Sequence, residues 1–416
     1  MVKIDLHGLG MYYGEEDLKL VDLSVEFAGV TFKNPIVAAS STTTKDARCM
    51  KKAIDAGFGG VVAKSLCGES ARLGRLYPKP RFKLFGWREY PGYPKSKTRY
   101  FTLHSLEEFS HFNYEEYADD INKAKKLIGD DGVVIASISG SNPEEWEELC
   151  DVINGTEADL CEANISCPYA ADMVATMGAG AVDQSPEIVR ILKKNLSVPL
   201  VAKLSPQTSN LLALSLAVEQ AGADALTLQA RLSGIMIDIE TAKPLGWGSI
   251  GGYGGPYLIG FGLKGVSEVA PRVKIPISAV LGVWEWSDII RYIMVGAKTV
   301  QSATAVIVRG YGVVRRWLRE ITRWMEEKGY ESLDELRGVA LKNILRTKDI
   351  ERAPKGVYMN VDREKCIGCG ECVLSCFYEA IRLEEGKARI DHEKCDVCGL
   401  CMEKCPTRAI YLTRGK

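Results

Sequence analysis

The 416-residue chain lacks several features that would assign it to a broad class of protein. It has no run of about 18 uncharged apolar residues, so it predicts no membrane-spanning helix. Its N-terminus has no basic segment followed by an apolar stretch, so it predicts no secretory signal. The formal net charge is −1, which predicts no overall attraction to nucleic acid or to a membrane surface. We therefore expect a soluble, cytoplasmic protein that binds neither.

Cysteine is sparse through most of the chain and abundant at its end. Eight of the 13 Cys lie in the last 51 residues. Without a secretory signal, such clustering indicates metal binding or catalysis rather than disulfides. The length predicts one large and one small domain, and 46% apolar residues suffice for a core. We expect the large domain in residues 1–350, a linker at Arg352–Lys355, and the small domain in residues 357–416.

Short apolar runs alternate with helical patterns after an N-terminal extension that contains a strand pair around Leu23–Phe32. The predicted strands are Pro35–Ser40, Gly60–Lys64, Val133–Ser139, Asp159–Asn164, Pro199–Lys203, Ala225–Gln229, Pro276–Val280 and Lys298–Ser302. The predicted helices include Thr44–Ala56, Asn113–Ile128, Pro143–Asn154, Ser185–Leu196 and Leu211–Ala221. Continuous apolar strands joined by helices predict a parallel sheet, and eight of them favour a closed (β/α)8 TIM barrel of the α/β class. The alternative is an open doubly wound sheet, but no Gly-x-Gly-x-x-Gly turn follows the first strand.

Polar side chains fall at the C-terminal ends of the predicted strands, where a barrel gathers its catalytic groups on one face. They are Ser40, Lys64, Ser139, Asn164, Lys203 and Arg231. One of these strands runs into the segment Asn164-Ile-Ser-Cys167-Pro168. A thiol there can act as nucleophile, metal ligand or proton donor. The alternative is a capped turn with a buried, inert cysteine.

An insertion at residues 72–100 follows the second predicted strand. It holds nine Lys/Arg, a single acid (Glu89) and the aromatic residues Tyr77, Trp87, Tyr90, Tyr93 and Tyr100. Long loops in barrels often form lids or binding surfaces, so this one can contact an anionic substrate or a redox partner. The alternative is a solvated basic loop. Farther on, Arg315–Ile350 predicts one or two amphipathic helices packed on the barrel exterior.

Two late segments predict a phosphate site. One is Ala279–Val283, and the other is Gly296-Ala297 followed by Val300–Thr304. The loops after strands 7 and 8 of many barrels bind phosphate with backbone N–H groups and a helix N-terminus. We therefore expect a phosphate-bearing cofactor.

The cysteine-rich tail contains the spacing Cys-x-x-Cys-x-x-Cys-x-x-x-Cys twice, which is the signature of two-cluster bacterial ferredoxins. In that signature the fourth cysteine of each run binds the other cluster. One [4Fe–4S] cluster is then expected on Cys366, Cys369, Cys372 and Cys405, and the other on Cys395, Cys398, Cys401 and Cys376. Phe377 stands where the pattern has proline. Zinc, the alternative, needs four thiolates in two pairs and does not explain triplets.

A cofactor site in a barrel, joined to two one-electron carriers, predicts a group that exchanges two electrons with an organic substrate and passes them on singly. A flavin is stable in three redox states and can do both. FMN carries one phosphate, which suits the predicted site.

Several motifs together carry a family resemblance. They are Asn164-Ile-Ser-Cys167-Pro168, Ala202-Lys203-Leu-Ser-Pro206, Leu232-Ser-Gly234-Ile-Met, Tyr253-Gly-Gly255, Gly296-Ala297 with Gln301, and the cysteine tail. Over residues 20–416 the chain resembles the FMN barrel and two-cluster ferredoxin part of dihydropyrimidine dehydrogenases, in the dihydroorotate dehydrogenase family. The resemblance implies an oxidoreductase of pyrimidine metabolism that acts on a CH–CH or C=C bond next to a carbonyl.

The resemblance also implies roles for individual residues. Ala39 and Ser40 would lie against the flavin, Lys64 and Lys203 would contact its ring or ribityl chain, and Asn164 would reach flavin and substrate. The phosphate would be held by backbone groups of Gly260, Gly282, Ala303 and Thr304. Cys167 would be the acid/base, assisted in catalysis by Lys64 and Asn164. A thiol with an ordinary pKa near 8.5 can be tuned toward neutrality for this task.

Some positions depart from the family pattern. An Asn-Thr pair that reads the pyrimidine is replaced by Ala230 and Arg231, and a further pyrimidine-reading Asn aligns with Thr102. The Gly-Gly before the phosphate is Leu281-Gly282. Losing an amide that reads an imide edge usually costs orders of magnitude in selectivity. With the basic insertion, Arg231 favours a substrate that carries a carboxylate or phosphate.

Four readings of function remain open on the sequence alone. A dihydropyrimidine or dihydroorotate is the default substrate of the family. The alternatives are an ene-reductase-type enzyme for a different, anionic substrate, an electron-transfer subunit of a larger redox complex, or a barrel that binds no flavin. The sequence shows no nicotinamide-binding domain, so we expect a ferredoxin or a flavoprotein NAD(P)H-oxidising subunit as electron partner, and an oligomer.

Overall fold

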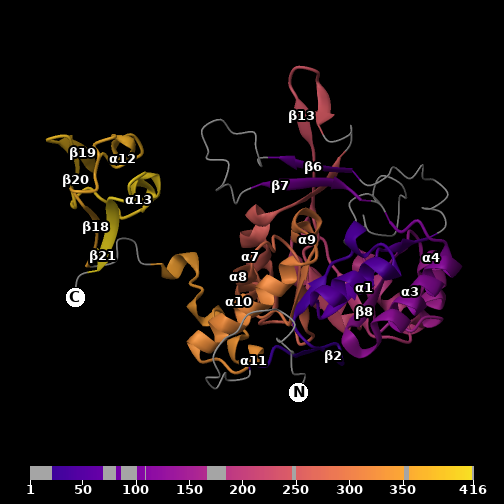
Figure 1. Cartoon of the computed structure of the whole chain (residues 1–416). Coiled ribbons are helices and arrows are strands. Elements are labelled where there is room, and N and C mark those ends of the chain that lie inside the picture. The colour runs from indigo at the N-terminus through magenta and orange to yellow at the C-terminus, as the bar shows by residue number, and fades with distance from the viewer. Residues whose placement is uncertain are drawn as a thin grey trace. The chain divides into compact units, whose positions relative to one another are not determined.

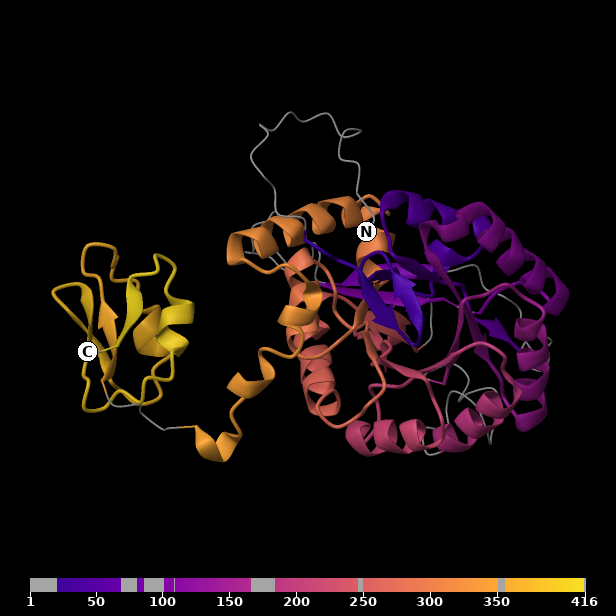
Figure 2. The same cartoon turned by 90° about the horizontal axis from the view of Figure 1, so that it is seen from below.

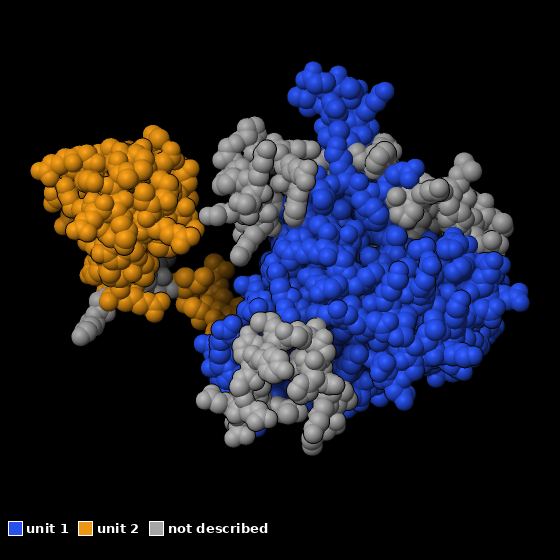
Figure 3. Space-filling view, in the orientation of Figure 1, with its two compact units in different colours: residues 1–342 blue, residues 343–416 orange. Residues whose placement is uncertain are grey.

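The computed structural model describes residues 21–68, 81–85, 101–107, 109–165, 184–245, 250–350 and 356–414. The chain divides into two compact units, Met1–Lys342 and Asn343–Lys416 (Figure 3). The division falls a few residues before the boundary expected from the sequence. The expected linker at Arg352–Lys355 lies outside the described residues.

The first unit is a closed barrel of parallel strands. Its strands are β3 (Ile36–Ala38), β4 (Gly60–Val62), β8 (Val133–Ser139), β9 (Leu160–Asn164), β10 (Leu200–Lys203), β11 (Ala225–Leu228), β16 (Ile277–Ala279) and β17 (Thr299–Ser302). Each pairs in parallel with its neighbours, and β17 joins β3 while β4 joins β8, which closes the ring. The short β5 (Leu66–Cys67) also pairs with β8. The predicted TIM barrel and its eight strands are confirmed.

Helices surround the strands as an outer layer (Figure 2). They are α1 (Ala47–Ala56), α3 (Tyr114–Ile128), α4 (Pro143–Asn154), α5 (Ser185–Asn195), α6 (Leu211–Gln220), α7 (Ile259–Val269), α8 (Trp286–Met294) and α9 (Thr304–Arg309). The five helices predicted from the sequence are confirmed to within a few residues at their ends. The strands they cover are buried on both faces, as β8 shows with all seven residues buried.

Polar caps and a glycine set several helix ends. The side chain of Asn113 accepts from the backbone N–H of Glu116, whose carboxylate accepts from the N–H of Asn113, at the start of α3. This capping box satisfies N–H groups that the first turn leaves without intrahelical partners. Asn142 caps α4 ahead of Pro143 by accepting from the backbone N–H of Glu145. Gly57 ends α1 with φ at +118°, a conformation that side chains disfavour.

The N-terminal end of the barrel is covered by the antiparallel pair β1 (Val25–Phe27) and β2 (Val30–Phe32), as Figures 1 and 2 show. Phe27 and Phe32 are fully buried there and meet edge to face, with ring centroids 6.1 Å apart. A Cβ at Gly60 would lie 2.6 Å from the Phe32 ring, so the first residue of β4 must be glycine. The pair predicted around Leu23–Phe32 is confirmed.

Two further helices pack on the barrel exterior. α10 (Val313–Lys328) buries Trp317, Ile321 and Met325, and α11 (Leu333–Leu336) buries both of its leucines. This agrees with the amphipathic pattern predicted for the segment. A Gly at position 329 ends α10 in the left-handed conformation, with φ at +77°.

Above the opposite end of the barrel lies a four-stranded antiparallel sheet that the sequence did not predict. Its strands run in the order β12 (Leu232–Gly234), β15 (Gly251–Gly254), β7 (Thr102–Leu106) and β6 (Arg81–Phe85). β6 and β7 show that part of the basic insertion is built as a hairpin rather than a loop. The hairpin of β13 (Met236–Asp238) and β14 (Lys243–Leu245) projects on the same side (Figure 1).

The second unit is a small duplicated fold. β18 (Val357–Val361) pairs with β21 (Ile410–Arg414), and β19 (Ile381–Glu384) pairs with β20 (Lys387–Ile390), both antiparallel. The short helices α12 (Glu371–Leu374) and α13 (Leu400–Lys404) lie within the two cysteine runs. Gly370 and Gly399 begin them at φ near +80°, as expected for tight turns beside the thiols.

Candidate active site and iron–sulfur centres

A pocket opens at the C-terminal ends of the barrel strands, beneath the antiparallel sheet. About 500 Å³ of space lies among its lining residues. They come from β7, the end of β11, β15, and the loops after β16 and β17, and include Ser105, Glu107, Ala230, Arg231, Gly254, Gly282, Ala303 and Thr304. Five residues predicted for substrate or phosphate therefore share one pocket. They come from distant parts of the sequence, as the barrel reading required.

Glycines in β15 make room for the polar side chains around this pocket. A Cβ at Gly251 would lie 2.2 Å from Nε2 of His104, and one at Gly252 would lie 2.7 Å from the guanidinium of Arg231. A Cβ at Gly254 would lie 2.9 Å from the hydroxyl of Thr304. Any side chain here would displace a polar group, which explains a strand composed mainly of glycine.

Arg231 lies at the pocket wall with 30% of its side chain exposed. Within the described residues its hydrogen bonds are made by Nη1, to the hydroxyl of Ser105 and to Glu107 at 3.4 Å. A guanidinium has five N–H donors in a planar fork, so Nε and Nη2 remain for a ligand. Arg231, which stands with Ala230 in place of the family's Asn-Thr pair, is therefore anchored on one side and available on the other.

Glu107 is the buried acid of the pocket. Its Oε1 accepts from the N–H and the hydroxyl of Thr42, both at 2.7 Å, and lies 4.0 Å from Nζ of Lys64. Burial acts to raise the pKa of this carboxyl, but Lys64, Arg231 and Thr42 together hold it below its ordinary value. The carboxylate of Glu107 thus lies between Lys64, predicted to contact the flavin, and Arg231, predicted to contact the substrate.

His104 lies behind this cluster and is fully buried. Its ring meets Tyr253 edge to face, with centroids 5.0 Å apart. Burial, and then the nearby Arg231, lower the pKa of His104 below its ordinary value. The imidazole is therefore neutral near pH 7 and adds no charge to the pocket.

The barrel interior below the pocket carries a buried ionic layer. Nζ of Lys203 donates to Oε1 of Glu162 at 2.9 Å. Oε2 of Glu162 accepts from the hydroxyl of Thr227 at 2.8 Å and from the amide of Gln301 at 2.7 Å. These four residues come from β10, β9, β11 and β17, and none is more than 7% exposed. Lys203, predicted to contact the flavin, is thus held by a carboxylate from the neighbouring strand.

A second polar group surrounds Asn164. Its amide donates to the hydroxyl of Ser65 at 3.2 Å. That hydroxyl also lies 2.8 Å from Ser137 and 3.3 Å from the predicted flavin contact Ser40. Ala39, the other predicted contact, is buried. Asn164 is therefore fixed in orientation at the end of β9.

The residues present fit a bound FMN. Gly282 has φ at +80°, and a Cβ there would lie 2.3 Å from the backbone nitrogen of Ile259 at the start of α7. Neither α7 nor α9, which starts at Thr304, has a side-chain cap, so their first N–H groups can face a phosphate. On the described barrel strands, three buried polar side-chain atoms have no hydrogen-bond partner: Ser278 Oγ, Gln301 Oε1 and Ser302 Oγ. Ring-edge groups and ribityl hydroxyls are suitable partners for such atoms.

Two residues predicted for substrate or phosphate lie outside this pocket, and the predicted acid/base is not among the described residues. Cys167, with its neighbours Ser166 and Pro168, is outside the described residues. Thr102 does not line the pocket, and its hydroxyl donates to the carbonyl of Gly254 at 3.1 Å. Gly260 is exposed in the first turn of α7 and does not line the pocket either.

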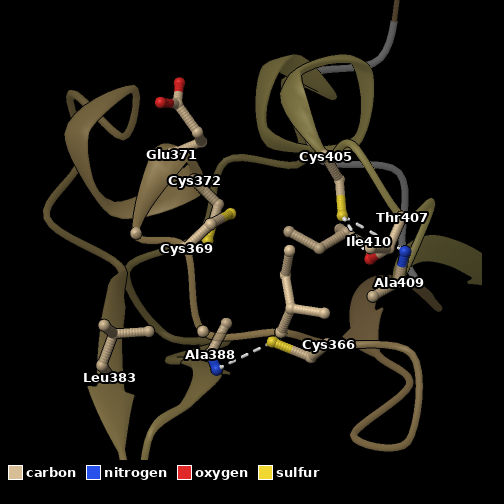
Figure 4. Close-up of a pocket in the computed structure, with 13 residues that line it drawn as sticks. Cys366, Cys369, Glu371, Cys372, Leu383, Ala388, Cys405, Thr407, Ala409 and Ile410 are labelled. Atoms are coloured by element: carbon tan, nitrogen blue, oxygen red, sulfur yellow. Dashed lines mark hydrogen bonds between the residues drawn. The ribbon is translucent and has the colours of Figure 1, made fainter.

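In the second unit, four thiols surround a common space, as Figure 4 shows. They belong to Cys366, Cys369, Cys372 and Cys405. The first three come from one run and the fourth from the other, which is the crossed set expected for one cluster. Thiols placed by a turn, a helix and a distant segment match the corners of a cube, since each binds a different iron.

Backbone N–H groups point at several of these sulfurs. Sγ of Cys366 accepts from Ala388 at 3.4 Å, and Sγ of Cys405 accepts from Ala409 at 3.2 Å (Figure 4). Burial acts to raise the pKa of the Cys405 thiol, but its hydrogen bonds, first that from Thr407, hold it below its ordinary value. Such bonds favour the thiolate that binds iron, and they tune the potential of a cluster.

The other four cysteines show the duplicate of this arrangement. Burial, and then the nearby thiols of Cys395 and Cys398, raise the pKa of the Cys401 thiol to about 11. Sγ of Cys376 accepts from the N–H of Ala380 at 3.4 Å, the same four-residue step that joins Cys405 to its own donor. Cys376 as the fourth ligand of the second cluster stays a prediction from the signature.

Sequence reasoning missed two acids that organise the barrel site. Glu162 interrupts an apolar strand, and a charged residue in such a strand signals a buried partner. Glu107 gave no comparable signal, because it follows an insertion whose structure the sequence did not reveal. Its partners Thr42 and Arg231 are 65 and 124 residues away.

Comparison with known proteins agrees with this geometry. The family model described as Dihydroorotate dehydrogenase matches residues 104–325, and that described as 4Fe-4S dicluster domain matches residues 359–412. The chain is 31% identical over 368 residues to the NAD-dependent dihydropyrimidine dehydrogenase subunit PreA of Escherichia coli (strain K12), covering 86% of this chain and 85% of that protein.

Archaeal relatives match the barrel. The catalytic subunit of dihydroorotate dehydrogenase B (NAD(+)) from Pyrococcus abyssi is 32% identical over 324 residues, or 77% of this chain and 99% of that subunit. The corresponding subunit of Methanocaldococcus jannaschii is 30% identical over 319 residues, or 76% of this chain and 98% of that subunit.

The predicted function class and cofactors are supported by these matches. The protein is a flavin-dependent oxidoreductase that binds FMN and two [4Fe–4S] clusters. Across the described part of the chain, no helix combines the length and apolarity that crossing a membrane requires. The barrel, its pocket and the dicluster unit agree with these matches, and this chain belongs to the dihydroorotate dehydrogenase family.

Proposed function

We propose that this chain is the catalytic subunit of a cytoplasmic enzyme that oxidises or reduces a CH–CH bond next to a carbonyl in a small, anionic substrate. Electrons would pass through the two clusters to or from a separate partner. That partner would be a ferredoxin or a flavoprotein that oxidises NAD(P)H. Two observations support a divided enzyme: the E. coli relative is named as a subunit of an NAD-dependent enzyme, and the P. abyssi relative as a catalytic subunit.

The observation that carries the substrate proposal is the position of Arg231. Its guanidinium lines the pocket, is anchored by described residues through Nη1, and follows Ala230, whose side chain can neither donate nor accept. An imide edge loses its amide reader at these two positions, whereas a carboxylate or phosphate gains a planar, charged donor. Substrates with an anionic group, dihydroorotate among them, therefore fit better than an uncharged dihydropyrimidine.

The other residues divide the remaining work. FMN, when bound, exchanges two electrons with the substrate and delivers them singly. Cys167 would give or take the proton at the neighbouring carbon through its sulfur. Asn164, fixed by its hydrogen bond to Ser65, would orient the substrate. Lys64 and Lys203 would contact the flavin, as the resemblance implies.

The test compares two substrates in the parent and in Arg231→Gln, which removes the charge and keeps a polar side chain. Dihydroorotate and dihydrouracil differ by one carboxylate, so the ratio of their kcat/KM values reports recognition of that group. We expect the parent to prefer dihydroorotate and the variant to lose that preference by about tenfold or more. The matched control is Arg309→Gln, an arginine that pairs with Glu285 and stacks on Trp284. An unchanged ratio in the Arg231 variant would refute the proposal.

A further inference from the structure

The ionic layer inside the barrel offers a residue with a role beyond packing. Barrel interiors are usually filled by Val, Ile and Leu. Here Glu162 is fully buried and accepts three hydrogen bonds, from Lys203, Thr227 and Gln301. We propose that Glu162 is a positioning residue that neutralises and orients Lys203 and thereby sets the reduction potential of the flavin.

Geometry gives Lys203 a single direction. Lys203 and Thr227 are register partners on β10 and β11, so their side chains leave the sheet on the same face. Thr227 and Gln301 both hold Oε2 of Glu162, which leaves Oε1 for the ammonium. A flexible lysine is thus confined by a carboxylate whose own position is fixed by two further strands.

Charge gives the sign of the effect. Reduction adds negative charge to the flavin, and a nearby cation favours it while a nearby anion opposes it. With Glu162 ionised, the pair is neutral overall. Without that carboxylate, the ammonium would act uncompensated in a buried place where screening is weak. Glu162 therefore keeps the potential lower than Lys203 alone would set it.

The inference rests on the proposed contact between Lys203 and the flavin. The experiment is a redox titration of the purified holoenzyme at pH 7 against a reference dye, with the flavin followed by its absorbance. In Glu162→Gln, which is nearly isosteric, we expect the equilibrium constant for flavin reduction to rise about tenfold or more. An equal or lower constant, with FMN fully bound, overturns the inference.

A matched control lies at the other end of the same strand. Asp159 precedes β9, pairs with Lys125 at 2.7 Å and accepts from the N–H of Val134 at 2.7 Å. Asp159→Asn makes the same chemical change in another lysine pair, about three residues from Glu162 along the strand, or roughly 10 Å. We expect no shift in the flavin equilibrium from this variant.

Two further variants separate the possible failures. If Lys203→Met leaves the flavin equilibrium unchanged, the proposed contact with the flavin is wrong; if it shifts the equilibrium and Glu162→Gln does not, only the present inference fails. If Glu162→Gln cannot hold FMN, the double variant with Lys203→Met removes both charges. Restored FMN binding would identify the unpaired ammonium as the fault and support the pairing. If FMN binding is not restored in the double variant, both residues serve barrel packing, and the inference is overturned.

Discussion

Oε2 of Glu107 lies 3.4 Å from Nη1 of Arg231, while Oε1 of the same carboxylate accepts two hydrogen bonds from Thr42. The acid thereby joins the end of β7 to the loop after β3 and to the residue that replaces the family's pyrimidine reader. Because the carboxylate is buried, its negative charge and the cations around it depend on one another. Two predictions concern this pocket directly.

Replacing Glu107 by Gln should destabilise the barrel in a pH-dependent way. The folded-state pKa of Glu107 is lowered, so its stabilising contribution is present above the unfolded value of about 4.3 and is lost as the pH falls through the folded value. At pH 7 the loss should be about 3 kcal/mol, because Arg231 and Lys64 lose a buried partner. The difference in apparent melting temperature between parent and variant should shrink from pH 5 toward pH 3. Glu148→Gln, which removes an acid on the outer helix α4, is the control. A constant difference across this range would contradict the assignment.

Replacing Gly282 by Ala should weaken FMN binding. The new Cβ would meet the backbone of Ile259, and φ at +80° adds strain of about 1–3 kcal/mol. We expect about a tenfold or greater rise in the FMN dissociation constant, measured by fluorescence on the folded protein. Gly260→Ala is the matched control, because nothing lies within 4 Å of a Cβ there and its N–H is kept. Equal FMN affinity in the two variants would exclude the Gly282 loop from the phosphate site.

The hydrophobic pattern of the sequence predicted most of the fold but little of the active site. The strands were predictable because each is a continuous apolar run between helix caps, and β8 is buried along its whole length. The antiparallel sheet above the pocket was not, because one of its strands, β6, lies in the insertion and another, β15, consists mainly of glycine. Glu107 and Arg231 meet only through that sheet. A contact across 124 residues leaves no local trace in a single sequence.

The cysteine tail was predictable for the opposite reason. The ligand spacing is local, and one turn with glycine at a positive φ brings three thiols together. The crossed membership of the fourth thiol came from the signature rather than from the spacing. Cys405 does lie beside Cys366, Cys369 and Cys372.

Paired serine substitutions should test that crossing. Cys369→Ser and Cys405→Ser should each remove one cluster, leaving about four of about eight irons per chain. Because both residues belong to the same cluster, their double variant should also keep about four. Combining Cys369→Ser with Cys398→Ser should remove both clusters. Iron analysis that finds none in the Cys369/Cys405 double variant would show that each run builds its own cluster.

Substituting Cys167 by Ser should separate catalysis from electron transfer. A hydroxyl is a much weaker acid than a thiol, so substrate turnover should fall about 100-fold or more. FMN content and the reduction of the clusters by a chemical reductant should persist. Turnover equal to that of the parent would instead favour a subunit that only relays electrons.

Cys376 and Cys405, the fourth cysteines of the two runs, occupy equivalent positions, since each accepts from the N–H four residues later, in Ala380 and Ala409. In the crossed arrangement, each cysteine run supplies its fourth thiolate to the cluster held by the other run. A nascent chain that ends before residue 405 therefore cannot complete its first cube, although three of that cube's ligands were made long before. Iron insertion at this first site must therefore wait until residue 405 has left the ribosome, whereas the four ligands expected for the second cube are already complete at residue 401.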